Sequence, residues 1–233
     1  MTSIAANLQA VRARIAAACI AAGRGAESVQ LLAVSKTWPA ALVREAAAAG
    51  QHAFGESYVQ EACDKAAELK DLGLEWHFIG PLQGNKTRPV AERFAWVHGV
   101  EREKIARRLS EQRPVTLPPL NVCVQVNVSG EASKHGVPPH QALDLARLVA
   151  TLPGLRLRGF MAIPEVAAGA ARSRFALLRA LLQQARAENL SVDTLSMGMS
   201  ADLEAAILEG STMVRVGSAI FGARHYQDQG RDP

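Results

Sequence analysis

The chain has 233 residues, of which 48% are hydrophobic and 21% charged, a composition that indicates a soluble globular protein and excludes a disordered one. The net charge of +4 comes from basic residues scattered among acidic ones, and no dense basic block or rich set of aromatic residues favours a nucleic-acid partner. Cys19, Cys63 and Cys123 are far apart and lack metal-binding spacing, so we expect reduced thiols in the cytoplasm.

The first predicted element is a helix over residues 3–22. Arg12 and Arg14 interrupt its apolar positions, so the segment is too charged to span a bilayer. It also lacks the layout of a signal peptide. We therefore expect this helix to pack against the fold of a cytoplasmic protein that has no membrane association.

Strand and helix patterns alternate along the rest of the chain. Short apolar or alternating runs predict eight strands, at 31–35, 52–56, 76–80, 96–100, 121–128, 155–162, 194–197 and 213–216. Helical patterns lie between them, at 39–49, 57–72, from 84 onward, 101–112, 140–151, 172–188 and 201–209. The polar residues 226–233 are expected to fray.

This order predicts an α/β protein with a single-domain TIM-like (β/α)8 barrel spanning residues 1–233. A Pro-rich segment at 113–119 looks like a surface loop, since the alternation resumes directly after it. Alternation alone would also fit a doubly wound sheet, so the sequence pattern leaves both architectures open.

Lys36 follows the apolar run 31–34, at the expected carboxyl end of a strand, and Pro39 then favours the start of a helix. Ligands collect at this end of the strands in α/β folds. An amine in a partly dry site loses its proton more readily, and a neutral amine attacks an aldehyde to form a Schiff base. A strand-end lysine that simply reaches water fits the same residues.

Two later loops carry small polar residues at strand ends. Ser200 precedes Ala201 at an expected helix start, where free N–H groups bind anions, although Ser200 could also serve only as the N-cap. Gly217 and Ser218 follow the eighth expected strand and offer N–H groups and a hydroxyl. Barrels commonly hold phosphate between the loops after strands seven and eight, so these three residues are candidates for a phosphate site.

Arg215 stands inside the eighth expected strand, between Val214 and Val216. A buried guanidinium needs a partner, because an unpaired buried charge is costly. The partner could be a carboxylate or a bound ligand. His77 lies between two aromatic residues and is expected to be a hydrogen-bonded core residue. No metal spacing, nucleophile elbow or phosphate-binding glycine loop occurs, so we expect no metal site.

Seven motifs together resemble a known family in their order and spacing. They are LLAVSKTWP, FGESYVQE, WHFIGPLQGNK, VQVNVSGEASKHG, LRGFMAIPE, LSMGMSADLEAAI and STMVRVGSAIFGAR. Over about residues 8–226 the chain resembles the pyridoxal phosphate homeostasis proteins, which are relatives of the N-terminal barrel of alanine racemase. The family commonly has asparagine at the position of Ser57. The shorter serine side chain could change a contact near the cofactor, so Ser57 is not among the predicted site residues.

The resemblance implies that pyridoxal 5'-phosphate (PLP) is carried as a Schiff base on Lys36. It also implies that Ser200, Gly217 and Ser218 hold the phosphate and that Arg215 faces the pyridine nitrogen. The implied function is intracellular PLP homeostasis, with effects on amino-acid and keto-acid balance and with PLP-requiring apo-enzymes as possible recipients.

The resemblance does not imply catalysis. Arginine always donates, so the pyridine nitrogen would stay unprotonated and the ring would stabilise carbanions weakly. Racemases of the related fold add a tyrosine base from a second domain, and neither Tyr58 nor Tyr226 can be assigned that role from the sequence. We therefore expect a monomeric, non-catalytic PLP carrier without catalytic residues. A PLP-dependent amino-acid racemase and a Schiff-base aldolase remain the alternatives.

Overall fold

The strands form a closed parallel barrel. The computed structural model describes residues 3–131, 134–164 and 171–223. Each strand pairs with the next, and the last pairs with the first, which confirms the predicted barrel and excludes the doubly wound sheet. In chain order the strands are β1 (Gln30–Val34), β2 (Ala53–Glu56), β3 (Glu75–Phe78), β4 (Trp96–Val100), β5 (Leu120–Gln125), β6 (Leu155–Met161), β7 (Thr194–Ser196) and β8 (Met213–Val216).

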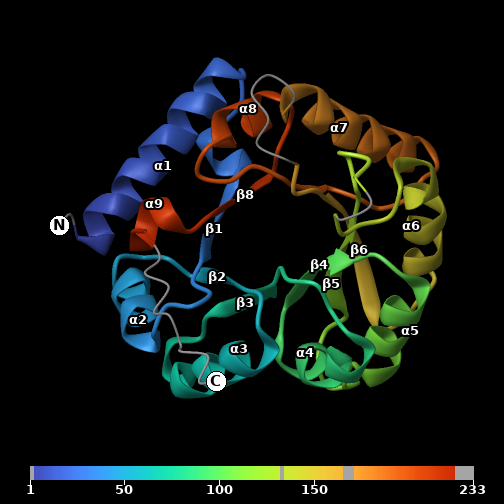
Figure 1. The fold of residues 1–233 in the computed structure, drawn as a ribbon, viewed down its shortest axis with the longest axis horizontal. Helices are drawn as coiled ribbons and strands as arrows, with labels where there is room; N and C mark the ends of the chain where they lie inside the picture. The colour runs from blue at the N-terminus through green and yellow to red at the C-terminus, as the bar shows by residue number, and fades with distance from the viewer. Residues whose placement is uncertain (1–2, 132–133, 165–170, 224–233) are drawn as a thin grey trace, which may run out of the picture.

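Helices form a ring around the barrel (Figure 1). They are α1 (Ile4–Ala21), α2 (Ala40–Ala48), α3 (Val59–Glu68), α4 (Thr87–Arg93), α5 (Glu103–Gln112), α6 (Ala142–Ala150), α7 (Ala171–Ala187), α8 (Leu203–Leu208) and α9 (Ser218–Phe221). Short 3-10 turns lie at Ala26–Ser28, Lys70–Leu72, Gly84–Lys86 and Pro139–Gln141. α1 lies beside α8 and α9, so the two ends of the described chain close the ring together (Figure 1).

Most predicted elements are present, and the differences lie at their ends. The sequence predicts a fifth strand that reaches Val128, but β5 ends at Gln125, and the next residue makes only an isolated bridge, to Val137. The helix expected from residue 201 begins at Leu203. α9 is missing from the prediction because a single helical turn shows no periodicity. The tail expected to fray, 226–233, lies outside the described residues.

α1 is a helix of the described chain that is long and apolar enough to cross a membrane by length and composition. Its residues Leu8, Val11 and Ile15 are buried, however. Arg14 on the same helix forms an ion pair with Glu204 of α8 at 2.8 Å. α1 therefore packs against the barrel, as the sequence predicts.

Alternating side chains create two separate cores, one between helices and sheet and one inside the barrel. The inner core is apolar at six positions: Leu32, Ala53, Trp96, Cys123, Met161 and Met213. The barrel interior also holds polar side chains. Arg215 pairs in register with Leu32, and His77 stacks on Trp96 with ring centroids 5.3 Å apart. Buried polar groups of this kind need hydrogen-bond partners, because burying them unpaired costs free energy.

Candidate functional site

The five residues singled out from the sequence line one cavity of about 250 Å³ at the carboxyl end of the barrel. The turn after β1 supplies Lys36, and the loop after β7 supplies Ser200. Arg215 comes from β8, and Gly217 and Ser218 come from the start of α9. The structure thus brings together residues from both ends of the sequence. Apolar walls complete the cavity: Val34, Ile79, Ile163 and Met199.

A larger hollow of about 920 Å³ opens beside this cavity. The two share four lining residues: Lys36, Ser57, Ile79 and Ile163. Tyr58 lines the larger hollow and is 56% exposed, whereas Tyr226 lies outside the described residues. Lys36 therefore stands where the smaller cavity meets the wider hollow, which suits a small ligand that enters from solvent.

Ser200 and Ser218 lie at one end of the small cavity, with their Oγ atoms 3.4 Å apart. The N-cap of α8 is Asp202, not Ser200, so the interpretation of Ser200 as merely a helix cap is wrong. Ser218 begins α9, where the first N–H groups have no acceptor within the helix. Two hydroxyls beside such N–H groups form a set of donors suited to a phosphate.

The loop that carries Ser200 is fixed from both sides. The Oδ1 atom of Asp202 accepts a hydrogen bond from the Met199 N–H at 2.6 Å. Arg14 donates to the Ser200 carbonyl at 3.1 Å while it pairs with Glu204. These contacts hold the loop in place without occupying the Ser200 hydroxyl.

Arg215 is 3% exposed and is held by oxygen atoms of β7 and of the segment after β6. Its Nη1 donates to the carbonyl and hydroxyl oxygens of Ser196 at 2.6 and 2.8 Å, and its Nη2 donates to the Ala162 carbonyl at 2.9 Å. Among the described residues, no carboxylate bonds to it directly. Burial lowers the Arg215 pKa to about 10, so the guanidinium stays charged at neutral pH. These bonds use three of its five N–H groups, which leaves donors for an acceptor in the cavity.

The turn that carries Lys36 rests on a buried charged network that the sequence pattern does not indicate. Lys65 of α3 donates to the Ser35 carbonyl at 2.7 Å, to Glu56 at 2.8 Å and to Glu61 at 2.6 Å. The Ser35 hydroxyl donates to the same Glu56 oxygen at 2.7 Å. In the sequence Lys65 resembles a solvent-facing helix residue, and only the packing of α3 against β2 reveals its burial.

The same network holds an unusual backbone conformation next to Lys36. Thr37 has a φ of 70°, in the left-handed region that a β-branched residue rarely adopts. Its N–H donates to Glu61 at 2.6 Å. Burial raises the pKa of Glu56, against the opposing effect of Lys65, and the second oxygen of Glu56 has no hydrogen-bond partner in the described chain. The position of Lys36 is thus set by residues on both sides of its turn.

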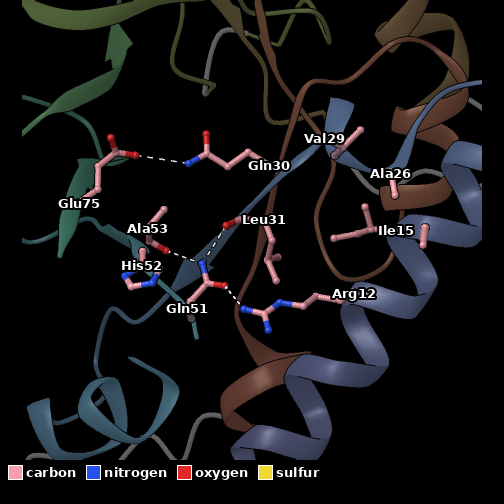
Figure 2. A pocket seen from close by; sticks show the side chains of 11 residues that line it. Arg12, Ile15, Ala26, Val29, Gln30, Leu31, Gln51, His52, Ala53 and Glu75 are labelled. Carbon is pink, nitrogen blue, oxygen red and sulfur yellow. Dashed lines mark hydrogen bonds between the residues drawn. The ribbon is translucent and has the colours of Figure 1, made fainter. Parts of the chain in front are cut away.

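Another hollow, of about 670 Å³, lies at the opposite end of the barrel (Figure 2). Its polar lining comes from α1 and from the starts of strands: Arg12, Gln30, Gln51, His52 and Glu75. Gln51 donates to the carbonyls of Leu31 and Ala53 and so joins β1 to β2, as Figure 2 shows. None of the site residues predicted from the sequence lines this hollow.

The other chemical groups named from the sequence have structural roles. His77 is buried and hydrogen-bonded within the barrel, as predicted. The three cysteines are free and buried. Within the described ranges, no three side chains of the metal-binding types come together at one point.

The sequence is similar to those of known proteins over nearly its whole length. The chain matches the family model of the alanine racemase N-terminal domain over residues 3–225. The pyridoxal phosphate homeostasis protein of Pseudomonas aeruginosa is 64% identical over 228 residues, which cover 97% of this chain and 98% of that protein. The protein of the same name from Escherichia coli K12 is 53% identical over 232 residues, covering 97% and 99%.

The fold of this chain is also similar to those of solved structures. PipY of Synechococcus elongatus PCC7942, solved with PLP bound, has a TM-score of 0.82 and 38% identity, and the match covers 94% of this chain and all of that one. Alanine racemase of Corynebacterium glutamicum has a TM-score of 0.69 at 19% identity, covering 96% of this chain and 63% of that one. The second match shows a shared fold alone.

Proposed function

This chain belongs to the pyridoxal phosphate homeostasis protein family, and we propose that its barrel carries PLP as a Schiff base on Lys36 and serves intracellular PLP homeostasis. The observation that carries the proposal is the convergence of Lys36, Arg215, Ser200 and Ser218 on one cavity. The relative PipY was solved with PLP bound, and its match covers nearly all of this chain.

The residues of the cavity suit the separate parts of PLP. Ser200, Ser218 and the backbone at Gly217 offer donors for the phosphate, while Arg215 offers N–H groups to an acceptor such as a pyridine nitrogen. Lys36 lies on the shared wall of the two hollows, where its amine can meet an aldehyde. Bound PLP supplies that aldehyde and an electron-withdrawing ring.

The protein acts in this proposal as a carrier and not as a catalyst. Arg215 is buried and remains charged at neutral pH, so it donates to the ring nitrogen and leaves the ring unprotonated, which weakens it as an electron sink. The wide hollow beside Lys36 gives the cofactor a path to PLP-requiring apo-enzymes. A monomeric cytoplasmic barrel that loads and releases PLP would thereby influence amino-acid and keto-acid balance.

Borohydride reduction of the PLP-loaded protein is expected to add one pyridoxyl group to its intact mass, because reduction makes the carbon–nitrogen link permanent. Lys36→Ala should lose this increment. Lys86→Ala is the matched control, since Lys86 is an exposed lysine that lines the larger hollow. An increment that persists in Lys36→Ala, or that is absent from the unmodified protein at PLP saturation, would show that the covalent assignment is wrong.

Ser200→Ala is expected to weaken PLP binding by about 1.5–3 kcal/mol, because it removes one hydrogen bond to a charged acceptor. The dissociation constant should rise by roughly 10- to 150-fold, as measured by titration of the PLP absorbance. Ser191→Ala, at an exposed serine near the amino end of the barrel, serves as the control. Equal dissociation constants for the two variants would place the phosphate elsewhere.

A further inference from the structure

A line of hydrogen-bonded polar side chains runs through the interior of the barrel. Arg215 Nη1 donates to the Ser196 hydroxyl at 2.8 Å, and this hydroxyl lies 2.8 Å from Nδ1 of His98. Nε2 of His98 lies 2.9 Å from Nδ1 of His77, and Nε2 of His77 lies 2.8 Å from Glu75. The line therefore joins the candidate PLP cavity to the hollow at the opposite end of the barrel, which Glu75 lines (Figure 2).

The residues at the two ends of this line determine which way its hydrogen bonds run, from donor to acceptor. The guanidinium of Arg215 can only donate, and an ionised carboxylate can only accept. Burial lowers the pKa of His77. Burial, together with the positive charge of Arg215, lowers the pKa of His98 far below its usual value, so both imidazoles are neutral at neutral pH. A neutral imidazole donates from one nitrogen and accepts at the other.

Each proton in the line can therefore be assigned. Glu75 accepts from Nε2–H of His77, which leaves Nδ1 of His77 to accept from Nε2–H of His98. Nδ1 of His98 then accepts from the Ser196 hydroxyl, whose oxygen accepts from Arg215. All four hydrogen bonds point the same way, so each one polarises the next.

The charge of Asp202 acts on the buried Arg215 through space and raises its pKa against the effect of burial, and the line of hydrogen bonds connects Arg215 to a second carboxylate, Glu75. The hydrogen bond from His77 holds the pKa of Glu75 below its usual value, so this side chain is ionised. Glu75 also accepts from Gln30 at 3.3 Å, as Figure 2 shows. The carboxylate stays partly in water while the guanidinium is buried, and the line of neutral groups connects them.

We propose that Glu75, His77, His98 and Ser196 are positioning residues that orient the Arg215 guanidinium toward the cavity and polarise it from the far end of the barrel. The part of this inference that concerns the cofactor rests on the proposed PLP function. An apolar filling of the same space would cost less free energy than two buried imidazoles and a serine, which argues against a role in packing alone. The stacking of the His77 ring on Trp96 keeps this imidazole in the orientation that its two hydrogen bonds require.

The free protein offers the first test, which needs no PLP. With histidine labelled by 15N, both His77 and His98 are expected to be neutral Nε2–H tautomers at neutral pH. With arginine labelled as well, Ser196→Ala should shift the Nδ1 signal of His98 and the Nη1 signal of Arg215, because both nitrogens lose their hydrogen bond to the hydroxyl while the carbonyls of Ser196 and Ala162 still hold the guanidinium. The exposed His52 is the internal control. A cationic ring, an Nδ1–H tautomer, or unchanged Arg215 signals in Ser196→Ala would overturn the proposal.

The PLP-loaded protein offers the second test. Ser196→Ala should raise the PLP dissociation constant about tenfold, and Ser196→Thr, which keeps the hydroxyl, should restore it. Glu75→Gln should change the absorbance spectrum of bound PLP, whereas Glu111→Gln, at an exposed glutamate, should not. Unchanged binding and spectra in both Ser196→Ala and Glu75→Gln would refute the coupling. If the unmodified protein binds no PLP, the proposed function fails, and the spectra of the free protein still decide the positioning of Arg215.

Discussion

Lys65→Met is expected to lower the free energy of unfolding by about 3–5 kcal/mol, because it removes one partner of a buried ion pair. The Glu56 side chain is fully buried and 2.8 Å from the Lys65 ammonium, so the substitution leaves an uncompensated charge inside the fold. Methionine retains much of the volume of the lysine stem, so a cavity contributes little to the loss. Urea unfolding curves of the two proteins measure the difference.

The loss should depend on pH. Burial raises the pKa of Glu56 and Lys65 opposes this rise, so in Lys65→Met the folded-state pKa should rise further. The folded-state pKa of this carboxyl then exceeds its unfolded value of roughly 4.3. Such a group contributes its full stabilisation at pH values below the unfolded pKa, and this contribution is lost as the pH rises through the folded-state pKa. The difference between Lys65→Met and the unmodified protein should therefore be larger near pH 8 than near pH 5.

Two controls separate the charge from other effects. The double variant Lys65→Met, Glu56→Gln removes both charges and should recover most of the lost stability. Lys70→Met, at an exposed lysine close in sequence, should change stability by no more than about 0.5 kcal/mol. A loss that does not vary with pH, and that the double variant does not reduce, would mean that packing and not charge explains the burial of Lys65.

The network around Lys65 also matters for the site, since it connects global stability to the position of one side chain. Ser35 and Thr37 flank Lys36, and both are held by the charged groups that Lys65 brings together. A left-handed threonine persists only where its surroundings fix it. We infer that the strain in this turn is maintained by Glu61 and Lys65.

Local spacing is enough to predict that the candidate site residues lie together at one end of the barrel, where they line the candidate cavity. Lys36, Ser200 and Ser218 each follow a short apolar run, and a parallel barrel brings all strand carboxyl ends to one face. Arg215 was predictable as a buried charge for the same reason, because it interrupts an apolar strand. These inferences require the order of the elements but not their detailed packing.

The partners of these residues were not predictable, because they depend on how distant segments pack. His98 and Ser196 are 98 positions apart in the sequence and meet only inside the closed barrel. The sequence predicts either a carboxylate or a ligand as the partner of Arg215, whereas the structure supplies backbone carbonyls and a hydroxyl. The burial of Lys65 could not be predicted, because helix periodicity alone does not show which polar residue faces a buried carboxylate.

Gly159→Ala is expected to destabilise the barrel by roughly 3 kcal/mol or more, because β6 and β7 could no longer approach each other as closely. Gly159 has a φ of 147° and pairs in register with Thr194, and an added Cβ would overlap the carbonyl oxygen of Thr194. Relief of this overlap requires one strand to move. The Ala162 carbonyl, just after β6, and Ser196 in β7 both hold Arg215, so PLP affinity should fall together with stability.

Gly23→Ala provides the matched control for this prediction. Gly23 also has a positive φ, of 66°, but an added Cβ there would meet nothing within 4 Å. Gly23→Ala should therefore cost only the conformational strain of about 1–2 kcal/mol and should leave PLP binding unchanged. Urea unfolding and PLP titration of both variants distinguish the two causes. Equal losses of stability and of PLP affinity in the two variants would show that backbone conformation alone requires glycine at 159. They would also show that the spacing of β6 and β7 does not control the hydrogen bonds to Arg215.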